Sequence, residues 1–535
     1  MIKSRSARIL AEREGLSLKL EDHFSKELPA DPLTTNERRQ VKGACFSTVV
    51  PRIPSKPVLV HASAKTADLV GIEEKELNSD AFLKVFSGKE LLPNSSPYAM
   101  CYGGHQFGHW AGQLGDGRAI NLAEVSHAGK RWALQLKGSG ETPYSRTADG
   151  LAVLRSSVRE HLCSEAMYHL GVPTSRSLSL MLTGDDVLRD VMYDGNPAYE
   201  KGAVVCRVAT SFLRFGSFEI HAANRDQATL TSLVDYTIRH HFPDLEAGAK
   251  QGYAAFFKSV CERSLTMVMH WQRVGFVHGV MNTDNMSILG DTIDYGPYGW
   301  LEGYDPNWTP NTTDRQHRRY RYGNQPEMVF WNLHKLANAL YVLVGEEKPF
   351  VDALEWYKNE FAIRDHAMHL SKLGLTGVEP RDADLIAELK EVLILVETDM
   401  TIFFRRLADC EKESAQDGLE TVRDAFYAPD SLEGDVLARW KEWFTAYGIR
   451  LRKEARVDEL RKSEMNAINP KYVLRNYMVQ LAIDAADKGD FNLVKELYEL
   501  SLKPYDEQRE MEKWFDKRPE WARSKVGCSM LSCSS

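Results

Sequence analysis

The sequence of 535 residues lacks the features of several specialised protein classes. No apolar run approaches the length of about 20 residues that a membrane-spanning helix needs, so we expect no membrane segment. The eight cysteines are spread along the chain without a C-x-x-C pair, which argues against a disulfide framework or zinc knuckle and for a reducing compartment. An excess of positive charge is also missing, because the formal net charge is -8. We therefore do not expect the chain to be a dedicated nucleic-acid-binding protein.

The composition is that of a soluble globular protein, with 43% hydrophobic and 27% charged residues. The amino-terminal segment MIKSRSARILAEREGLSL has no apolar core, so it is not typical of a secretory signal. Glu12 and Glu14 argue against a mitochondrial presequence, because such segments are poor in acids. We expect a cytoplasmic location, with the mitochondrion as the alternative.

One segment, from His278 to Gly296, contains a candidate metal site. Apolar runs on both sides of a Gly-Asp pair predict two short strands joined by a tight turn. That hairpin would bring Asp284, Asn285 and Asp294 to one end. Carboxylate and amide oxygens are ligands suited to Mg²⁺ or Mn²⁺ that hold phosphates.

The same segment has the order of a protein kinase's catalytic loop followed by its metal-binding D-F-G motif. His278, Asn285 and the D-Y-G beginning at Asp294 match that order, but Val280 occupies the position of the kinase's catalytic Asp. Valine cannot accept a proton, so ordinary kinase chemistry is not expected from this segment. Taken alone, the pattern is more typical of a surface hairpin with acidic turn residues, and the upstream segments are what favour a functional site.

Upstream lies a glycine-rich stretch, 102–118, which allows backbone amides to approach a ligand closely. His105 and His109 have helical spacing, but the flanking glycines disfavour a helix and no third ligand follows, so zinc is not expected. Alternation predicts strands at 119–125 and 131–137. The second ends in Lys137 beside Gly-Ser-Gly, which suits contact with phosphate; an edge lysine exposed to solvent is the alternative.

Residues 152–170 are predicted to form a helix with Glu160 in its middle, where a kinase glutamate would pair with the strand lysine. In 203–219, predicted as a strand followed by a turn or short helix, Arg207 and Arg214 lie in apolar surroundings. Each arginine therefore needs either a bound phosphate or a structural ion pair.

Helices dominate the rest of the prediction, at 249–274, 328–345, 349–373, 381–408, 434–447, 470–486 and 490–503. The basic-aromatic run 315–322 follows the D-Y-G motif. We interpret it as a contact for a protein substrate or phosphate rather than for RNA.

Taken together, the chain resembles the selenoprotein O family. The most specific stretches are YGGHQFGHWAGQLGDGRA, TPYSR, VLRSSVREHLCSEAM, RFGSFE and HGVMNTDNMSILGDTIDYGP. The resemblance implies an α+β, protein-kinase-like bilobal fold that binds ATP in a flipped orientation. The implied activity is transfer of AMP to hydroxyl side chains of proteins.

The resemblance also implies roles for individual residues. Asp284 would accept the proton, four residues beyond Val280, and Glu160 would pair with Lys137. Asn285 and Asp294 would bind Mg²⁺ or Mn²⁺, and Asp294 would also belong to the nucleotide site. The other residues implied to hold ATP are Gly115, Gly117, Arg118, Lys137, Asp149, Gly150, Arg207 and Arg214.

The implied organisation has four parts, which are a family-specific region at 1–100, a kinase-like N-lobe at 101–205, a C-lobe with the metal site at 206–345, and a helical region with a cysteine tail at 346–535. Two positions depart from the family pattern. Leu151 stands where an arginine is expected, and Pro310 replaces a cysteine that could pair with tail Cys533.

The expected partners are therefore ATP and proteins bearing Ser, Thr or Tyr hydroxyls, without nucleic acid or membrane. Three alternatives remain open at this point. They are transfer of UMP, a true kinase with a displaced base, and a non-catalytic ATP-binding scaffold.

Overall fold

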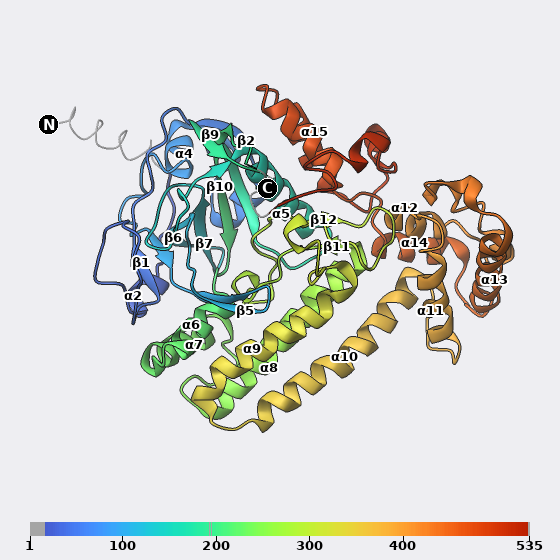
Figure 1. Ribbon diagram of the computed structural model, residues 1–535, viewed down its shortest axis with the longest axis horizontal. Helices are drawn as coiled ribbons and strands as arrows, with labels where there is room; N and C mark the ends of the chain where they lie inside the picture. Colours follow the sequence, from blue (N-terminus) through green and yellow to red (C-terminus); the bar gives the residue numbers. More distant parts are fainter. Residues whose placement is uncertain (1–15, 192, 194, 533–535) are drawn as a thin grey trace.

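The computed structural model describes residues 16–191, 193 and 195–532. It combines a large antiparallel sheet with many helices (Figure 1), so the expected α+β class is confirmed. The amino-terminal residues up to 15 and Cys533 lie outside the described residues, and so do the expectations that concern them. No helix in the described part of the chain is long and apolar enough to cross a membrane.

The main sheet has eight strands in the order β1-β3-β6-β7-β10-β9-β2, and β8 pairs with β10. The strands are β1 Phe46–Thr48, β2 Val58–Ala62, β3 Tyr98–Met100, β6 Ala119–His127, β7 Lys130–Lys137, β8 Ala152–Val153, β9 Arg176–Arg189 and β10 Ala198–Ala209. Two small sheets are formed by β4 Gly103–Gln106 with β5 His109–Gln113, and by β11 Phe276–Val277 with β12 Gly299–Trp300. The expected domain boundaries at residues 100 and 205 both fall inside the main sheet.

Alternation along the central strands divides the sheet into two faces. On one face, residues such as Leu134 of β7 and Cys206 of β10 pack with α3 Ala64–Val70 and α4 Asp80–Phe86. On the other face, Ala133 and Val205 join the core that includes α5 Leu154–His169. Odd-numbered residues of β7 and β10 therefore face α5, and these include Gln135, Lys137 and Arg207.

Helices dominate the remainder of the described chain, with irregular segments between them. Figure 1 shows α8, α9 and α10 as long helices below the sheet, and the group α11 to α14 has its own apolar core. The helices not yet given are α2 Phe24–Glu27, α6 Phe215–Ala223, α7 Gln227–His241, α8 Lys250–Val274, α9 Gln325–Val344, α10 Lys348–Lys372, α11 Asp382–Val392, α12 Met400–Leu407, α13 Gly434–Leu451, α14 Asp458–Ile468, α15 Asn476–Ala486 and α16 Asn492–Ser501.

Most predicted elements are confirmed, with small shifts at their ends, as β6, β7, α5 and α8 show. The single helix predicted at 381–408 is wrong, because α11 and α12 are separate. Asp399 explains the break. Its carboxylate accepts the amide of Ile402 at 3.0 Å and starts α12, and it also forms a buried ion pair with Arg475, 2.6 Å from Nη1. Strand β9 and the helices α7 and α14 are among the elements that were not predicted.

The two strands predicted within 278–296 are also wrong. The segment has one bridge between Met286 and Thr292, and Thr283–Asn285 forms a single 3₁₀ turn. The reason is that neighbouring residues pair with other segments, since Ser287 pairs with Arg214 and Thr292 with Thr174. The predicted turn is present, and the amide of Gly290 donates to Ser287 O at 3.2 Å.

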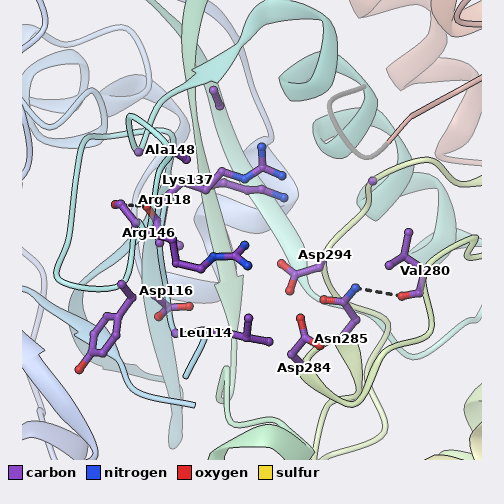
Figure 2. A pocket seen from close by; sticks show the side chains of 18 of the residues that line it. Leu114, Asp116, Arg118, Lys137, Arg146, Ala148, Val280, Asp284, Asn285 and Asp294 are labelled. Atoms are coloured by element: carbon purple, nitrogen blue, oxygen red, sulfur yellow. Dashed lines mark hydrogen bonds between the residues drawn. The ribbon is translucent and has the colours of Figure 1, made fainter. Parts of the chain in front are cut away.

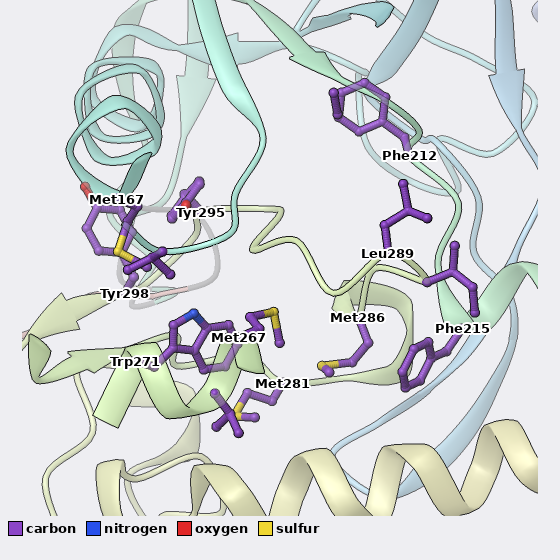
Figure 3. Close-up of a cluster of buried hydrophobic side chains, with 14 of the residues drawn as sticks. Met167, Phe212, Phe215, Met267, Trp271, Met281, Met286, Leu289, Tyr295 and Tyr298 are labelled. Carbon is purple, nitrogen blue, oxygen red and sulfur yellow. The ribbon is translucent and has the colours of Figure 1, made fainter. Parts of the chain in front are cut away.

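An apolar cluster beneath this segment fixes its position (Figure 3). Met281, Met286 and Tyr295 from the segment are buried with Trp271 of α8. The indole Nε1 of Trp271 donates to Thr292 Oγ1 at 2.8 Å, which ties the cluster to the backbone turn. The polar residues of the segment are therefore presented from a rigid, packed base.

Candidate active site

A cavity of about 660 Å³ lies between the sheet and the 278–297 segment (Figure 2). All the residues predicted to act on nucleotide or metal line it. They are Gly115, Gly117, Arg118, Lys137, Asp149, Gly150, Arg207, Arg214, Asp284, Asn285 and Asp294. The structure thus brings together positions that are up to 179 residues apart in the sequence (115 to 294).

The sheet contributes cations to this cavity from its α5 face. Lys137 Nζ lies 2.5 Å from Glu160 Oε2, so the predicted pair is present, and Arg207 Nη1 lies 3.0 Å from Glu160 Oε1. Gln135 on the same face accepts a hydrogen bond from Arg207. Burial lowers the pKa of Lys137 to about 8, against the opposing charge of Glu160. One glutamate therefore holds two cations at the cavity wall.

Asp294, from the 278–297 segment, faces the sheet and lies between Arg207 and Arg214. Its carboxylate is 2.5 Å from Arg207 Nη1 and also accepts a hydrogen bond from Arg214. Burial alone would raise the pKa of Asp294, but Arg214, Arg207 and Lys137 outweigh it and hold the pKa well below its ordinary value. Asp294 has a φ of 58°, in the left-handed region that Asp adopts more readily than most residues. The carboxylate is thus ionised and fixed in direction.

Asp284 has a different environment. Its Oδ2 accepts a hydrogen bond from Gln106 Nε2 at 3.1 Å, while its Oδ1 is buried without a hydrogen-bond partner among the described residues. Burial raises the pKa of Asp284 to about 6, against the Gln106 hydrogen bond and the charge of Arg214. Two carboxylates that face one cavity therefore have their pKa values shifted in opposite directions, a pattern typical of catalytic sites.

Asn285 is oriented by its own loop, because its Nδ2 donates to Val280 O at 2.9 Å. This hydrogen bond leaves the amide oxygen of Asn285 for another partner. Figure 2 shows the side chains of Asp284, Asn285 and Asp294 converging on the same part of the cavity. His278 Nε2 lies 2.9 Å from Ile293 O and links the two halves of the segment.

Two of the predicted glycines also have a packing role, which the sequence did not indicate. A Cβ at Gly115 would lie 2.3 Å from the ring of Tyr144, and a Cβ at Gly150 would lie 2.2 Å from Gly140 O. Both glycines have positive φ and allow the chain to pack against itself around the cavity. Protein atoms therefore account for the need for glycine at these two positions, and their expected contact with a nucleotide stays a prediction.

Asp149 lines the cavity but forms an ion pair with Arg189, whose Nη1 is 2.8 Å from Asp149 Oδ2. Arg118 makes no ion pair within 4.0 Å among the described residues. Sequence reasoning missed Arg189 together with the strand β9 that carries it. It also missed Gln106 and Asp116, although both lie in the glycine-rich stretch that was singled out.

Comparisons with known proteins all point to one family. Residues 32–502 match the family described as "Protein adenylyltransferase SelO". A relative from Flavobacterium johnsoniae is 62% identical over 97% of this chain and 100% of its own length. Relatives from Rhodopirellula baltica and Aromatoleum aromaticum are 54% and 52% identical over 97% of this chain and cover 99% and 100% of their own lengths. All three carry the name "Protein nucleotidyltransferase YdiU".

Proposed function

Because the chain belongs to the SelO family of protein adenylyltransferases, we propose that it transfers AMP from ATP to Ser, Thr or Tyr hydroxyls of other proteins. The observation that carries this proposal is the pair of unlike carboxylates beside Asn285. Asp294 is held ionised by two arginines, while Asp284 presents an unpartnered oxygen to the cavity. Val280, at the kinase base position, has no such chemistry.

In the proposed reaction, the acceptor hydroxyl oxygen forms a bond to the α-phosphorus of ATP. The bond from that phosphorus to the bridging oxygen breaks, and pyrophosphate leaves with the electron pair. The hydroxyl proton passes to the carboxylate of Asp284. General-base assistance of this kind contributes about 10²–10⁴-fold.

Cations at the cavity would bind the phosphates and stabilise the charge that develops on pyrophosphate. Arg207 Nε and Arg214 Nη2 are buried without hydrogen-bond partners among the described residues. Such donors are costly unless an anion or other acceptor meets them. Lys137 and Arg118 add two further charges along the same wall. Fixed donors in a site that excludes water are the largest expected electrostatic contribution.

The oxygen donors present also fit a divalent metal. Asp294 and the amide oxygen of Asn285 would hold Mg²⁺ or Mn²⁺, hard cations that prefer such ligands. When bound, the metal would neutralise charge on the phosphates. Asp294 is paired with Arg207 and Arg214, so the phosphates of ATP would share these two arginines with its carboxylate.

We also infer that the molecule has the two-lobed organisation of a protein kinase. The pair Lys137–Glu160 on strand and helix, the bond from His278 to Ile293 O, and the order of Asn285 and Asp294 support this inference. The sheet and α5 would be the N-lobe, and α6 to α9 would be the C-lobe. The strands at 46–62 and the end of β10 would extend the N-lobe beyond the expected 101–205.

UMP transfer is a second candidate, because the relatives' names specify nucleotidyl transfer without saying which nucleotide is transferred. The deciding experiment compares ATP and UTP, each labelled at the α-phosphate, with Mg²⁺ or Mn²⁺ and a soluble protein extract as acceptor. Label from ATP that unlabelled UTP does not compete away supports AMP transfer. A preference for UTP would show that the transferred nucleotide is UMP and would overturn the proposed transfer of AMP.

A further inference from the structure

The basic run from Arg315 to Arg321 does not line the cavity, but Tyr320 within it contacts two residues that do. Four arginines and no acid occur among these seven residues, in a chain of net charge -8. Arg315, His317 and Arg318 are exposed. No ion pair within 4.0 Å among the described residues involves any of the four arginines. The charge of this run is therefore left for a partner.

The run is held in a fixed conformation. The carboxylate of Asp314, which is buried, accepts the amides of Arg319 at 2.9 Å and Tyr320 at 2.7 Å. The amide of Arg318 donates to Asp314 O at 2.7 Å. A basic loop with this many backbone hydrogen bonds loses little conformational entropy when it binds.

Arg319 is the most restrained of the arginines. Its guanidinium lies over the ring of Trp331, 4.6 Å from the centroid, and its Nε is buried without a hydrogen-bond partner among the described residues. A Cβ at Gly108, in the β4–β5 turn, would be 3.6 Å from its Cζ. A guanidinium stacked in this way keeps its edge available for a carboxylate.

The loop is linked to the residue proposed as the base through the segment that contains Gln106 and Phe107. Tyr320 OH donates to Asn282 Oδ1 at 2.6 Å, and the amide of Phe107 donates to Tyr320 OH at 3.1 Å. Gln106, next to Phe107, donates to Asp284. Gln106, Phe107 and Asn282 all line the cavity, so the arginines lie just outside the end at which an acceptor hydroxyl must reach Asp284.

We propose that Arg315, Arg318 and Arg319 form a docking surface for acidic segments of the acceptor protein, which brings a nearby hydroxyl to Asp284. The inference rests on the proposed transfer of AMP to proteins. Charge complementarity identifies the partner, because unpaired arginines beside the entrance would attract Asp- and Glu-rich sequences and raise the rate of encounter. RNA is also a polyanion, and the test below distinguishes binding of RNA from binding of an acidic peptide.

The test uses two labelled peptides, Glu-Glu-Glu-Ser-Tyr-Thr-Glu-Glu-Glu and its counterpart with Gln in place of every Glu. Binding is measured by fluorescence anisotropy, and transfer is measured with α-labelled ATP. The wild-type chain should bind and modify the acidic peptide at least about tenfold better, with a preference that weakens as salt rises. The triple variant Arg315→Gln, Arg318→Gln, Arg319→Gln should lose that preference and keep its affinity for ATP.

Two control variants separate charge from structural damage. Replacing the same three arginines by Lys should retain most of the preference. Lys441→Gln, Lys488→Gln, Lys503→Gln removes three exposed cations from the helical region around α13 to α16 and should change nothing.

Equal binding of the two peptides by the wild type, or an unchanged preference in the triple variant, would overturn the docking surface. Tighter binding of a 20-nucleotide RNA that displaces the acidic peptide would overturn it in favour of nucleic acid. Absence of α-label transfer to any protein would instead refute the proposed function, and the binding measurement would still decide the surface.

Discussion

Replacing Asp284 by Asn tests the proposed base with the smallest change in shape. Asn keeps an oxygen that can accept the hydrogen bond from Gln106, but it cannot take the proton of the acceptor hydroxyl. Transfer should therefore fall by about 10²–10⁴-fold, equivalent to about 3–5 kcal/mol of barrier. ATP affinity should stay within about threefold, because the phosphate-facing cations Lys137, Arg207 and Arg214 are unchanged. The variant should also melt no lower than the parent, since it removes a charge that burial disfavours.

Two measurements on one preparation decide the matter, namely calorimetric titration with ATP and single-turnover transfer of α-label. Asp291→Asn is the matched control. Burial also raises the pKa of Asp291 to about 6, and it lies seven residues along the same segment, but it does not line the cavity. Its transfer rate should stay near that of the wild type. If Asp284→Asn loses ATP binding as fully as Asp294→Asn, both residues are metal ligands and the base assignment is wrong.

Two further predictions follow from buried charges. Asp294→Asn should abolish metal-dependent ATP binding and destabilise the fold by about 3 kcal/mol, because buried Arg214 loses its nearest carboxylate, whereas Arg207 keeps Glu160. Calorimetry with and without Mg²⁺ and a thermal melt check this, and retained Mg²⁺ dependence would contradict it. Acid should weaken the fold between pH 6.5 and 4. Burial lowers the pKa of His61 to about 4 and of His161 well below 6.5, so the unfolded chain takes up protons that the folded chain refuses. His61 alone should cost about 2 kcal/mol at pH 5. The free energy of unfolding, measured by denaturant titration, should differ less between pH 8 and pH 5 in His61→Gln than in the wild type. An equal difference in the two proteins would be evidence against this effect of His61.

Local patterns were sufficient to predict the elements that carry the cations. Alternation in 131–137 predicted β7, and the same alternation places Lys137 and Arg207 on one face of neighbouring strands, where they meet Glu160. The helix at 152–170 followed from apolar spacing. These features depend on short-range periodicity, which the sequence shows directly.

Features that depend on distant partners were not predictable in this way. The segment after His278 has strand-like apolar residues, but it makes only one bridge to itself, Met286 to Thr292, and otherwise pairs one residue at a time with Thr174 and Arg214. Gln106 gains its role only when the β4–β5 hairpin packs on the 3₁₀ turn of Asp284. Arg189 could be matched to Asp149 only once β9 was placed. In each case tertiary contacts outweigh local propensity.

The most direct test of the central claim is which phosphate of ATP reaches protein. Purified chain is incubated with Mg²⁺, a soluble protein extract and ATP labelled at either the α- or the γ-phosphate, with Asp284→Asn as the blank. The proposal predicts protein label from α-labelled ATP only, together with release of pyrophosphate. Protein label from γ-labelled ATP only would show that the chain is a kinase and would contradict the proposed transfer of AMP.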